Sequence, residues 1–385
     1  LLQAVCLAIP AVSIYLIGTR RLGRPLAGLA MAAAYLAFPA LQWAAVWHFH
    51  PETLAAGFLG LAALAADRQR WRQMAVWLVL ALLCKEDVGL VVAGFGALLW
   101  TTGHRLVGRR TLAAGLGWFL LTVLVLIPLT NGRPSPHLEL NYGITGSGPT
   151  VLLEAVPTLA GNVWTNVTDG KGATYLLLIF APFLGLPLLD PRWLLPAAPP
   201  ILLNLAATHG YQQEIRYQYL ATAAPFLVLA AIAGLRVVAR RRVVLASLLV
   251  ALVAVAGFID YRVGPAPWSN DFPRPAEDGP LIQARRQALD LIDPAAAVSA
   301  HYNLAPHLAH RTHVYEFPNP FTAPNWGFPG DRHQPAEVER LRYVVVERPL
   351  LGEADAALLD QLRTQPQWHT VLDRQGIVVL ERRPP

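Results

Sequence analysis

Long apolar stretches separated by short polar segments dominate the first 260 residues of the chain. About ten stretches can be distinguished, at about 1–19, 26–47, 53–66, 74–84, 88–101, 111–130, 173–189, 193–208, 219–235 and 243–259. Several approach the roughly 20 residues that an α-helix needs to cross a bilayer. The pattern predicts an α-helical polytopic membrane protein whose transmembrane helical domain covers residues 1–260.

Arginines gather in the short connections between these stretches. The clusters are Arg20, Arg21 and Arg24; Arg68, Arg70 and Arg72; Arg105, Arg109 and Arg110; and Arg236, Arg240, Arg241 and Arg242. Short Arg-rich loops belong on the cytoplasmic side of a plasma membrane. We therefore expect a multi-pass protein of the plasma (inner) membrane with every one of these clusters inside.

The stretch over residues 74–101 decides the orientation of everything after it. As one helix it would be about 42 Å long, which exceeds the roughly 30 Å hydrocarbon core. It would also place the arginine clusters at 105–110 and 236–242 on the outer side of the membrane. As two segments of about 17–20 Å each, joined at Lys85, Glu86 and Asp87, it keeps every arginine cluster inside. We favour two segments, with the charged triplet at their tip and at partial depth below the outer surface. A tilted, kinked arrangement of the same two segments is the alternative.

With this choice, we expect the outer face of the membrane to contain residues 48–52, the triplet, a loop at about 131–172, residues 209–219 and everything after Asp260. Residues 261–280 form a Pro-rich linker, and residues 281–385 have the alternating pattern of a small extracytoplasmic α/β domain. In that domain we expect helices at 281–292 and 353–364, strands at 296–300 and 342–347, and two strands within 367–382 around Gln375 and Gly376.

The triplet is the first candidate site. One charge at the bilayer centre costs about 2.5–3.5 kcal/mol, so adjacent charges must pair or face water. In a helical backbone Lys85 pairs easily with only one of Glu86 and Asp87, which leaves the other for a cation, a proton or a substrate group. The structural alternative is a self-neutralised turn whose carboxylates cap the following helix.

Two further polar stretches stand at the outer edge. In "HFHPE", an extended backbone would place His48, His50 and Glu52 on one side, where they could hold a divalent cation; alternatively Pro51 and Glu52 begin the next helix. The stretch "THGYQQEIRYQY" offers Glu214 and Arg216, and arginine suits phosphate or carboxylate binding. We expect the tyrosines of this stretch, Tyr211, Tyr217 and Tyr219, to lie at the membrane–water interface as an aromatic belt. The histidines of "HYNLAPHLAHRTH" (301–313) match no metal spacing, and we expect them at the surface.

Composition agrees with a membrane protein, since 54% of the residues are hydrophobic and only 15% are charged. The net charge of +6 comes largely from inner-loop arginines, so nothing indicates nucleic acid. Cys6 and Cys84 lie in apolar runs and are expected to be packing residues. The chain begins at Leu1 within an apolar run, so we expect that it is a piece of a longer protein.

The segments "QWAAVWHFHPETLAAGFLGLAALAADRQRW", "LLCKEDVGL" and "VSAHYNLAPHLAHRTHVYEFP" resemble an uncharacterised family of predicted bacterial membrane proteins, common in actinobacteria. That family looks like a branch of the GT-C glycosyltransferases. The resemblance covers nearly the whole chain and implies a polytopic enzyme acting at the outer face on a polyprenyl-phosphate-linked sugar and a cell-envelope acceptor. The main catalytic acid of such enzymes lies in their first outer loop, which we expect upstream of Leu1.

Under this hypothesis Glu86 or Asp87 handles the acceptor or a cation, and Lys85 and Arg216 contact the lipid phosphate. Glu214, His50 and Glu52 are further substrate-binding candidates. A secondary transporter that uses the triplet for proton coupling is an alternative, although no inverted repeat is visible in the sequence. A non-catalytic envelope assembly protein is another.

Overall fold

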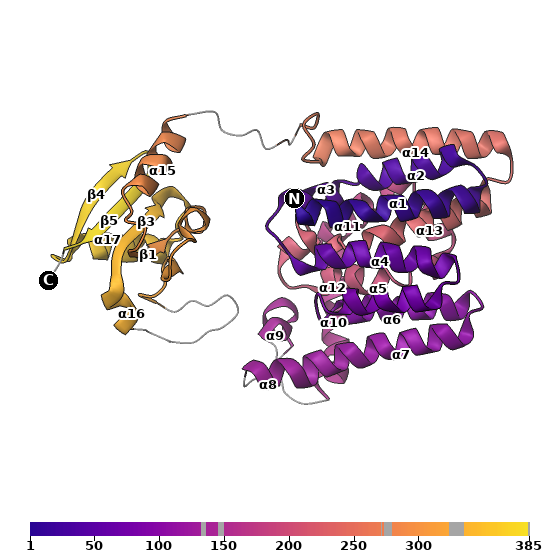
Figure 1. Cartoon of the computed structure of the whole chain (residues 1–385), viewed down its shortest axis with the longest axis horizontal. Coiled ribbons are helices and arrows are strands. Elements are labelled where there is room, and N and C mark those ends of the chain that lie inside the picture. Colours follow the sequence, from indigo (N-terminus) through magenta and orange to yellow (C-terminus); the bar gives the residue numbers. More distant parts are fainter. Residues whose placement is uncertain (132–135, 145–149, 271, 273–278, 323–334, 384–385) are drawn as a thin grey trace. The chain divides into compact units, whose positions relative to one another are not determined.

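The computed structural model describes residues 1–131, 136–144, 150–270, 272, 279–322 and 335–383. These residues form two compact units, Leu1–Pro273 and Arg274–Pro385. The first unit is helical and the second contains a sheet flanked by helices (Figure 1).

The first unit is built from helices that mostly begin at a proline or follow a tight connection, as expected because proline fits the first helical position. The helices are α1 (Leu2–Leu22), α2 (Pro25–Leu36), α3 (Pro39–Val46), α4 (Pro51–Asp67), α5 (Trp71–Leu82), α6 (Val88–Thr101), α7 (Arg105–Leu121), α8 (Ile127–Asn131), α9 (Pro136–Tyr142), α10 (Val151–Thr168), α11 (Lys171–Phe180), α12 (Ala198–Ala206), α13 (Ala224–Val238) and α14 (Arg242–Val263). A π-helical segment, η1 (Thr122–Leu126), joins α7 to α8.

Among the described residues, three helices are long and apolar enough to cross a membrane: Leu2–Leu22, Arg105–Thr130 and Arg242–Val263. A fourth span results if α2 and α3, which are bent by 52° at their junction, are counted as one. The other apolar helices, including α5, α6 and α13, are shorter. The expected ten apolar segments are therefore not all membrane-length helices.

The segment between α11 and α12 departs most from expectation. Two apolar helices were expected at 173–189 and 193–208, but the structure has short 3-10 turns between α11 and α12, namely η2 (Ala181–Phe183), η3 (Leu186–Leu189) and η4 (Pro191–Leu194). Pro182, Pro187 and Pro191 explain this, because proline removes a helical hydrogen bond and clashes with the preceding turn.

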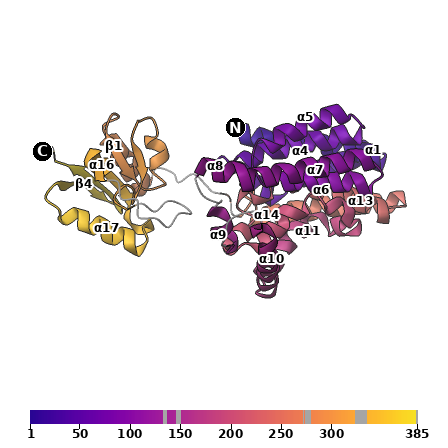
Figure 2. The same ribbon diagram turned by 90° about the horizontal axis from the view of Figure 1, so that it is seen from below.

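The loop expected at about 131–172 is also different, because it contains α9 and α10. In Figure 2, α10 stands out from the layer of helices. Its side-chain amides attach it to the end of α12: Asn162 donates to the carbonyl of Ala206 at 3.0 Å, and Asn166 donates to that of Leu205 at 2.8 Å.

Two side-chain contacts show which helix ends of the first unit lie together. Arg21, at the end of α1, pairs with Asp67, at the end of α4, at 2.8 Å. Trp71, where α5 begins, contacts His104, which follows α6, with ring centroids 4.9 Å apart. The connection between α5 and α6 therefore lies at the opposite end from these residues. The prediction of two segments joined at the charged triplet is confirmed.

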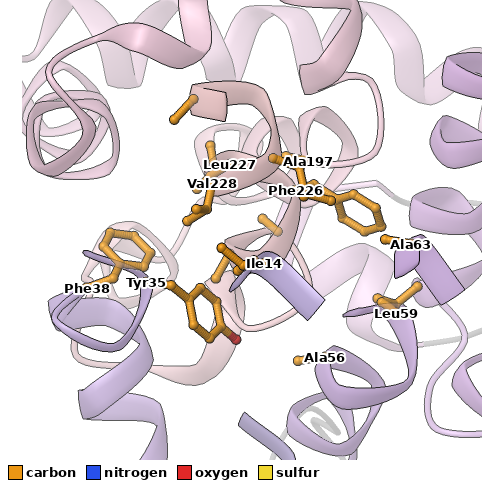
Figure 3. Close-up of a cluster of buried hydrophobic side chains, with 14 of the residues drawn as sticks. Ile14, Tyr35, Phe38, Ala56, Leu59, Ala63, Ala197, Phe226, Leu227 and Val228 are labelled. Carbon is orange, nitrogen blue, oxygen red and sulfur yellow. The ribbon is translucent and has the colours of Figure 1, made fainter. Parts of the chain in front are cut away.

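The core of the first unit lies where α1, α2, α4 and α13 meet (Figure 3). Ile14, Tyr35, Leu59 and Phe226 are among its fully buried side chains. Helices α6 and α7 approach still more closely, because a Cβ added at Gly96 would lie 2.2 Å from the backbone nitrogen of Leu112. Small residues at such positions allow backbone contact between membrane helices.

The second unit is a five-stranded sheet with the order β2-β1-β3-β5-β4. Its strands are β1 (Ala297–Ala300), β2 (Val314–Glu316), β3 (Leu341–Glu347), β4 (Trp368–Arg374) and β5 (Ile377–Arg382), and its helices are α15 (Pro280–Asp290), α16 (Pro335–Arg340) and α17 (Glu353–Thr364). Strand β1 is parallel to β2 and β3, and β5 is antiparallel to β3 and β4. Helix α15 covers one face and α17 the other.

The helices and strands predicted for this unit are confirmed, with small shifts in their bounds. Strand β2 was missed, since it has only three residues and none of them is fully buried. The expectation of surface histidines is wrong for His301, which is 4% exposed because it directly follows the buried strand β1. Its backbone N–H donates to the carbonyl of Val345 at 2.9 Å.

Burial gives His301 a pH-dependent effect on stability. Desolvation lowers the pKa of its imidazole from 6.5, partly opposed by Glu347. The unfolded chain therefore binds more protons on this residue than the folded chain below about pH 6.5, so stability should decrease as the pH falls from there. Replacing His301→Gln should reduce the loss of Tm of the second unit between about pH 7.5 and 5.5, whereas His310→Gln, at an exposed site, should not. An equal loss in both variants would contradict this assignment.

Candidate functional site

The strongest candidate site is the group of charges around Lys85. The Nζ atom of Lys85 lies 3.2 Å from Oε1 of Glu52 and 3.3 Å from Oδ2 of Asp87. The Glu52 side chain is only 6% exposed, compared with 27% for Lys85 and 38% for Asp87. Glu86 is half-buried and makes no hydrogen bond or ion pair with the described part of the chain, although its charge acts on Lys85. We call Glu52, Lys85, Glu86 and Asp87 the acidic cluster.

Local sequence explains how these side chains meet. Pro51 begins α4, so Glu52 lies in the first helical turn, where the helix dipole favours a carboxylate. Helix α5 ends at Leu82 and α6 begins at Val88, which leaves the triplet in a short turn between two apolar helices. The neighbouring α4 and α5 bring Glu52 and Lys85 together across 33 positions of sequence.

Gln3 in α1 fixes the segment that leads into α4. Its Nε2 donates to the carbonyls of Ala44 at 2.6 Å and Trp47 at 3.1 Å. Its Oε1 accepts from the backbone N–H of His50 at 3.0 Å and from Oγ1 of Thr53 at 3.1 Å. Sequence analysis missed this residue, and the available signal was a single amide in an otherwise apolar stretch.

Tyrosines from two other segments lie near the acidic cluster. Tyr142 of α9 and Tyr219 both interact electrostatically with Lys85. Rings near Tyr219 form a continuous group: Tyr211 lies 6.1 Å and Tyr217 6.3 Å from it between centroids, and Trp47 lies 5.1 Å from Tyr217. The tyrosines expected as an interfacial belt thus stand beside the cluster, and Tyr142 was not expected there.

The structure does not support the proposed metal site at His48, His50 and Glu52. These residues do not form one extended strand, because the helix α4 begins at Pro51, and Glu52 turns toward Lys85. His48 instead stacks on Trp47 with centroids 5.0 Å apart. Within the described ranges, no group of three or more His, Cys, Asp or Glu side chains is arranged to hold a metal ion.

Arg216 and Glu214 belong to a different feature. Both line a pocket of about 440 Å³ together with Lys171 and Gln213. The guanidinium carbon of Arg216 also lies 5.3 Å from the ring centroid of Trp43. Lys85 and Arg216 were expected to contact the same phosphate; in the structure, Lys85 is held by carboxylates and Arg216 lines this pocket.

The chain matches a family described as predicted membrane protein (DUF2079) over residues 1–379. It belongs to this family. No curated protein and no solved structure matches the chain. The protein is thus a membrane protein of the DUF2079 family, and its apolar helices contact the lipid bilayer.

Charge defines what the acidic cluster of this DUF2079 protein can do. It contains three carboxylates and one ammonium group, a formal charge of −2 when all are ionised. Glu52 and Asp87 both pair with Lys85, and these three groups carry a net charge of −1. Glu86 makes no ion pair with the described residues, so it is the carboxylate able to accept a proton or bind a cationic or hydroxyl-bearing ligand. Such a cluster is better suited to general-base chemistry than to phosphate binding.

Proposed function

We propose that the protein is a membrane glycosyltransferase that transfers a sugar from a polyprenyl-phosphate donor to a cell-envelope acceptor at the outer face of the plasma membrane. The observation that carries the proposal is a half-buried carboxylate, Glu86, without an ion-pair partner in the described structure, held beside the Glu52–Lys85–Asp87 ion pairs at one end of a helical membrane unit. Ionisable side chains within a membrane unit carry a cost in free energy, and they are usually found where they serve a function.

In the proposed reaction Glu86 is the general base. As the acceptor hydroxyl oxygen bonds to the anomeric carbon, its proton passes to the Glu86 carboxylate. The bond between the anomeric carbon and the phosphate oxygen breaks, and its electron pair remains on the polyprenyl phosphate. Lys85 and Glu52 are positioning residues, because their ion pair fixes the turn that carries Glu86. Asp87 holds Lys85 from the other side.

The proposed topology is multi-pass, with the arginine clusters in the cytoplasm and the second unit outside. The grouping of helix ends supports it, since Arg21 and Asp67 lie at one end and the acidic cluster at the other. Reporter fusions after residues 110 and 385 should be active inside and outside the cell respectively. A fusion after residue 385 that is active only in the cytoplasm would contradict this topology.

The activity itself is tested with purified protein, a polyprenyl-phosphate sugar labelled in the sugar, and cell-envelope acceptors. We expect the label to leave the lipid fraction and appear on the acceptor fraction. Solute flux in proteoliposomes without sugar transfer would instead indicate a secondary transporter. If neither sugar transfer nor solute flux is detected, and the second unit retains a protein partner, the result would indicate an assembly protein.

A further inference from the structure

Helix α10 presents one side to the rest of the first unit. Val151 and Ala155 on this side are buried in a small apolar cluster. Asn162 and Asn166 lie on the same side, because residues four or seven positions apart point in similar directions on a helix. Their side-chain amides donate to backbone carbonyls of α9 and of the end of α12, at distances from 2.8 to 3.1 Å. The polar groups that could face water are therefore turned toward the protein.

The opposite side of α10 is apolar and exposed. Leu153, Val156 and Trp164 are 75%, 58% and 73% exposed, and Ala160 between them is exposed as well. At about 100° per residue, these four side chains fall within about 80° of one another around the helix. We call them the α10 stripe. Single exposed apolar residues are normal on a protein, whereas a contiguous exposed group marks an interaction surface.

A polar line runs along α10 beside the stripe. Glu154, Thr158 and Thr165 are exposed and fall within about 40° of one another around the helix. The free surface of α10 is thus divided lengthwise into an apolar and a polar part. A helix surrounded by water is polar over its free surface, and a helix surrounded by acyl chains is apolar over it. A helix that lies at the membrane–water interface has both parts.

A membrane-length helix packs against α10. Leu124 belongs to the span Arg105–Thr130 and contacts the cluster that contains Val151 and Ala155. Leu129, near the end of this span, is 75% exposed and belongs to the surface that the span presents to lipid. Helix α10 runs across α7, the first part of this span, rather than along it (Figure 2). A helix that crosses a span runs along the plane of the membrane.

The contact at Leu124 also sets the depth of α10. The span Arg105–Thr130 has 26 residues and is about 39 Å long, so when centred it extends about 4–5 Å beyond each side of the roughly 30 Å hydrocarbon core. Leu124 lies about 9 Å along the helix from Thr130. It is therefore about 5 Å inside the edge of the core. Interfacial helices bury their apolar side by roughly 5–10 Å, which agrees with this position.

We propose that α10 is an interfacial helix that lies in the plane of the membrane and inserts the α10 stripe among the acyl chains of one leaflet. Glu154, Thr158 and Thr165 face the water, and Trp164 stands at the boundary that indole rings prefer. The leaflet is the one nearer Thr130, which is the outer leaflet in the proposed topology. Because α10 contains no lysine or arginine, burial of the stripe, rather than attraction to anionic headgroups, supplies the affinity.

Spin labels along α10 test this placement in the full chain, reconstituted in phosphatidylcholine nanodiscs. Each label is attached to one introduced cysteine, in a background with Cys6→Ala and Cys84→Ala, which removes both natural cysteines. If that background does not fold, the natural cysteines are kept and the spectrum of the unsubstituted chain is subtracted. The substitutions are Leu153→Cys, Val156→Cys and Trp164→Cys on the stripe, and Glu154→Cys, Thr158→Cys and Thr165→Cys on the polar line.

The measurement is the accessibility of each label to oxygen, which concentrates in acyl chains, and to a water-soluble nickel chelate. We expect the ratio of oxygen to nickel accessibility to be several-fold higher at every stripe position than at every polar-line position. The ratio should thus rise and fall along the chain with the 3.6-residue period of a helix. Adding phosphatidylglycerol or salt should not change it, because α10 has no basic residue.

Val156→Glu, combined with the label at position 153, places a charge in the stripe. Val156 is exposed and points away from the buried side of α10, so the helix should still form. A carboxylate among acyl chains is unfavourable, and the ratio at position 153 should fall to the polar-line value. Thr158→Glu is the matched control, since it adds the same charge on the polar line and should leave the ratio unchanged.

Three results would overturn the proposal. High nickel accessibility at all six positions would place α10 in water. Low accessibility to both reagents on the stripe, with magnetic broadening between labels of different molecules, would show that a second copy covers it. The same low accessibility without broadening would show that another part of the chain covers it. No donor or acceptor is present, so the outcome is independent of whether the protein transfers sugar.

Discussion

Replacing Lys85 with methionine is expected to lower the free energy of unfolding of the first unit by about 3 kcal/mol, because breaking a buried ion pair leaves an uncompensated charge. Glu52 is the charge left behind, since its side chain is only 6% exposed. Asp87 is 38% exposed and can be hydrated when Lys85 is absent. The loss should therefore come mainly from Glu52.

A double-mutant cycle isolates this interaction. Glu52→Gln alone should cost less, because Lys85 retains Asp87 at 3.3 Å. The variant with both Glu52→Gln and Lys85→Met should be more stable than the sum of the single losses predicts, with a coupling energy of about 2 kcal/mol. Unfolding by SDS titration in mixed micelles, followed by tryptophan fluorescence, measures each loss.

The matched control is the ion pair between Arg348 and Asp360 in the second unit. Its atoms are 2.8 Å apart, which is closer than those of Lys85 and Glu52, but both side chains are about half exposed. Exposed pairs contribute about 0–1 kcal/mol. Coupling energies of similar size in the two cycles would contradict the claim that burial, rather than distance, makes the Lys85 pair important.

The position of this site was predictable from the sequence to a useful degree. Helix length and the arginine clusters placed Lys85 at a turn between two apolar segments, and the structure has that turn. The partner Glu52 was not predictable as such, since its contact with Lys85 depends on how α4 and α5 pack. Local patterns constrain neighbours in a helix, whereas contacts between helices depend on packing angles that no short motif encodes.

The errors have equally physical causes. Apolar composition around residues 173–208 indicated two spans, but Pro182, Pro187 and Pro191 convert this region to short turns. Residues 131–172 were expected to form an outer loop, yet α10 forms over Val151–Thr168 and is attached to α12 through Asn162 and Asn166. In the second unit, period-two alternation and the Gln375–Gly376 turn gave the strands correctly, because those signals are local.

Replacing Glu86 with glutamine is expected to lower the rate of sugar transfer by about 10²–10⁴, the usual contribution of a general base. Glutamine has nearly the same shape and can still accept a hydrogen bond, but it cannot take the acceptor proton. Glu86 makes no ion pair with the described residues, so its neutralisation should leave the ion pairs of Lys85 and the stability intact. The measurement is the initial rate with labelled donor at saturating acceptor.

Glu154→Gln is the matched control for this prediction, because Glu154 is an exposed carboxylate in the first turn of α10. It should transfer sugar at the rate of the unmodified chain. Asp87→Asn should act differently from both variants. It weakens the hold on Lys85 and should lower stability along with rate, whereas Glu86→Gln lowers the rate alone.

The separation between rate and stability is what distinguishes a base from a structural turn. If Glu86 only capped α6, its carboxylate would act through the helix dipole, and Glu86→Gln would cost a few tenths of a kcal/mol in stability without affecting chemistry. An unchanged transfer rate with a small loss of stability would therefore reject Glu86 as the base. A large loss of rate with an unchanged free energy of unfolding would place the defect in proton transfer, because the Lys85 ion pairs do not involve Glu86.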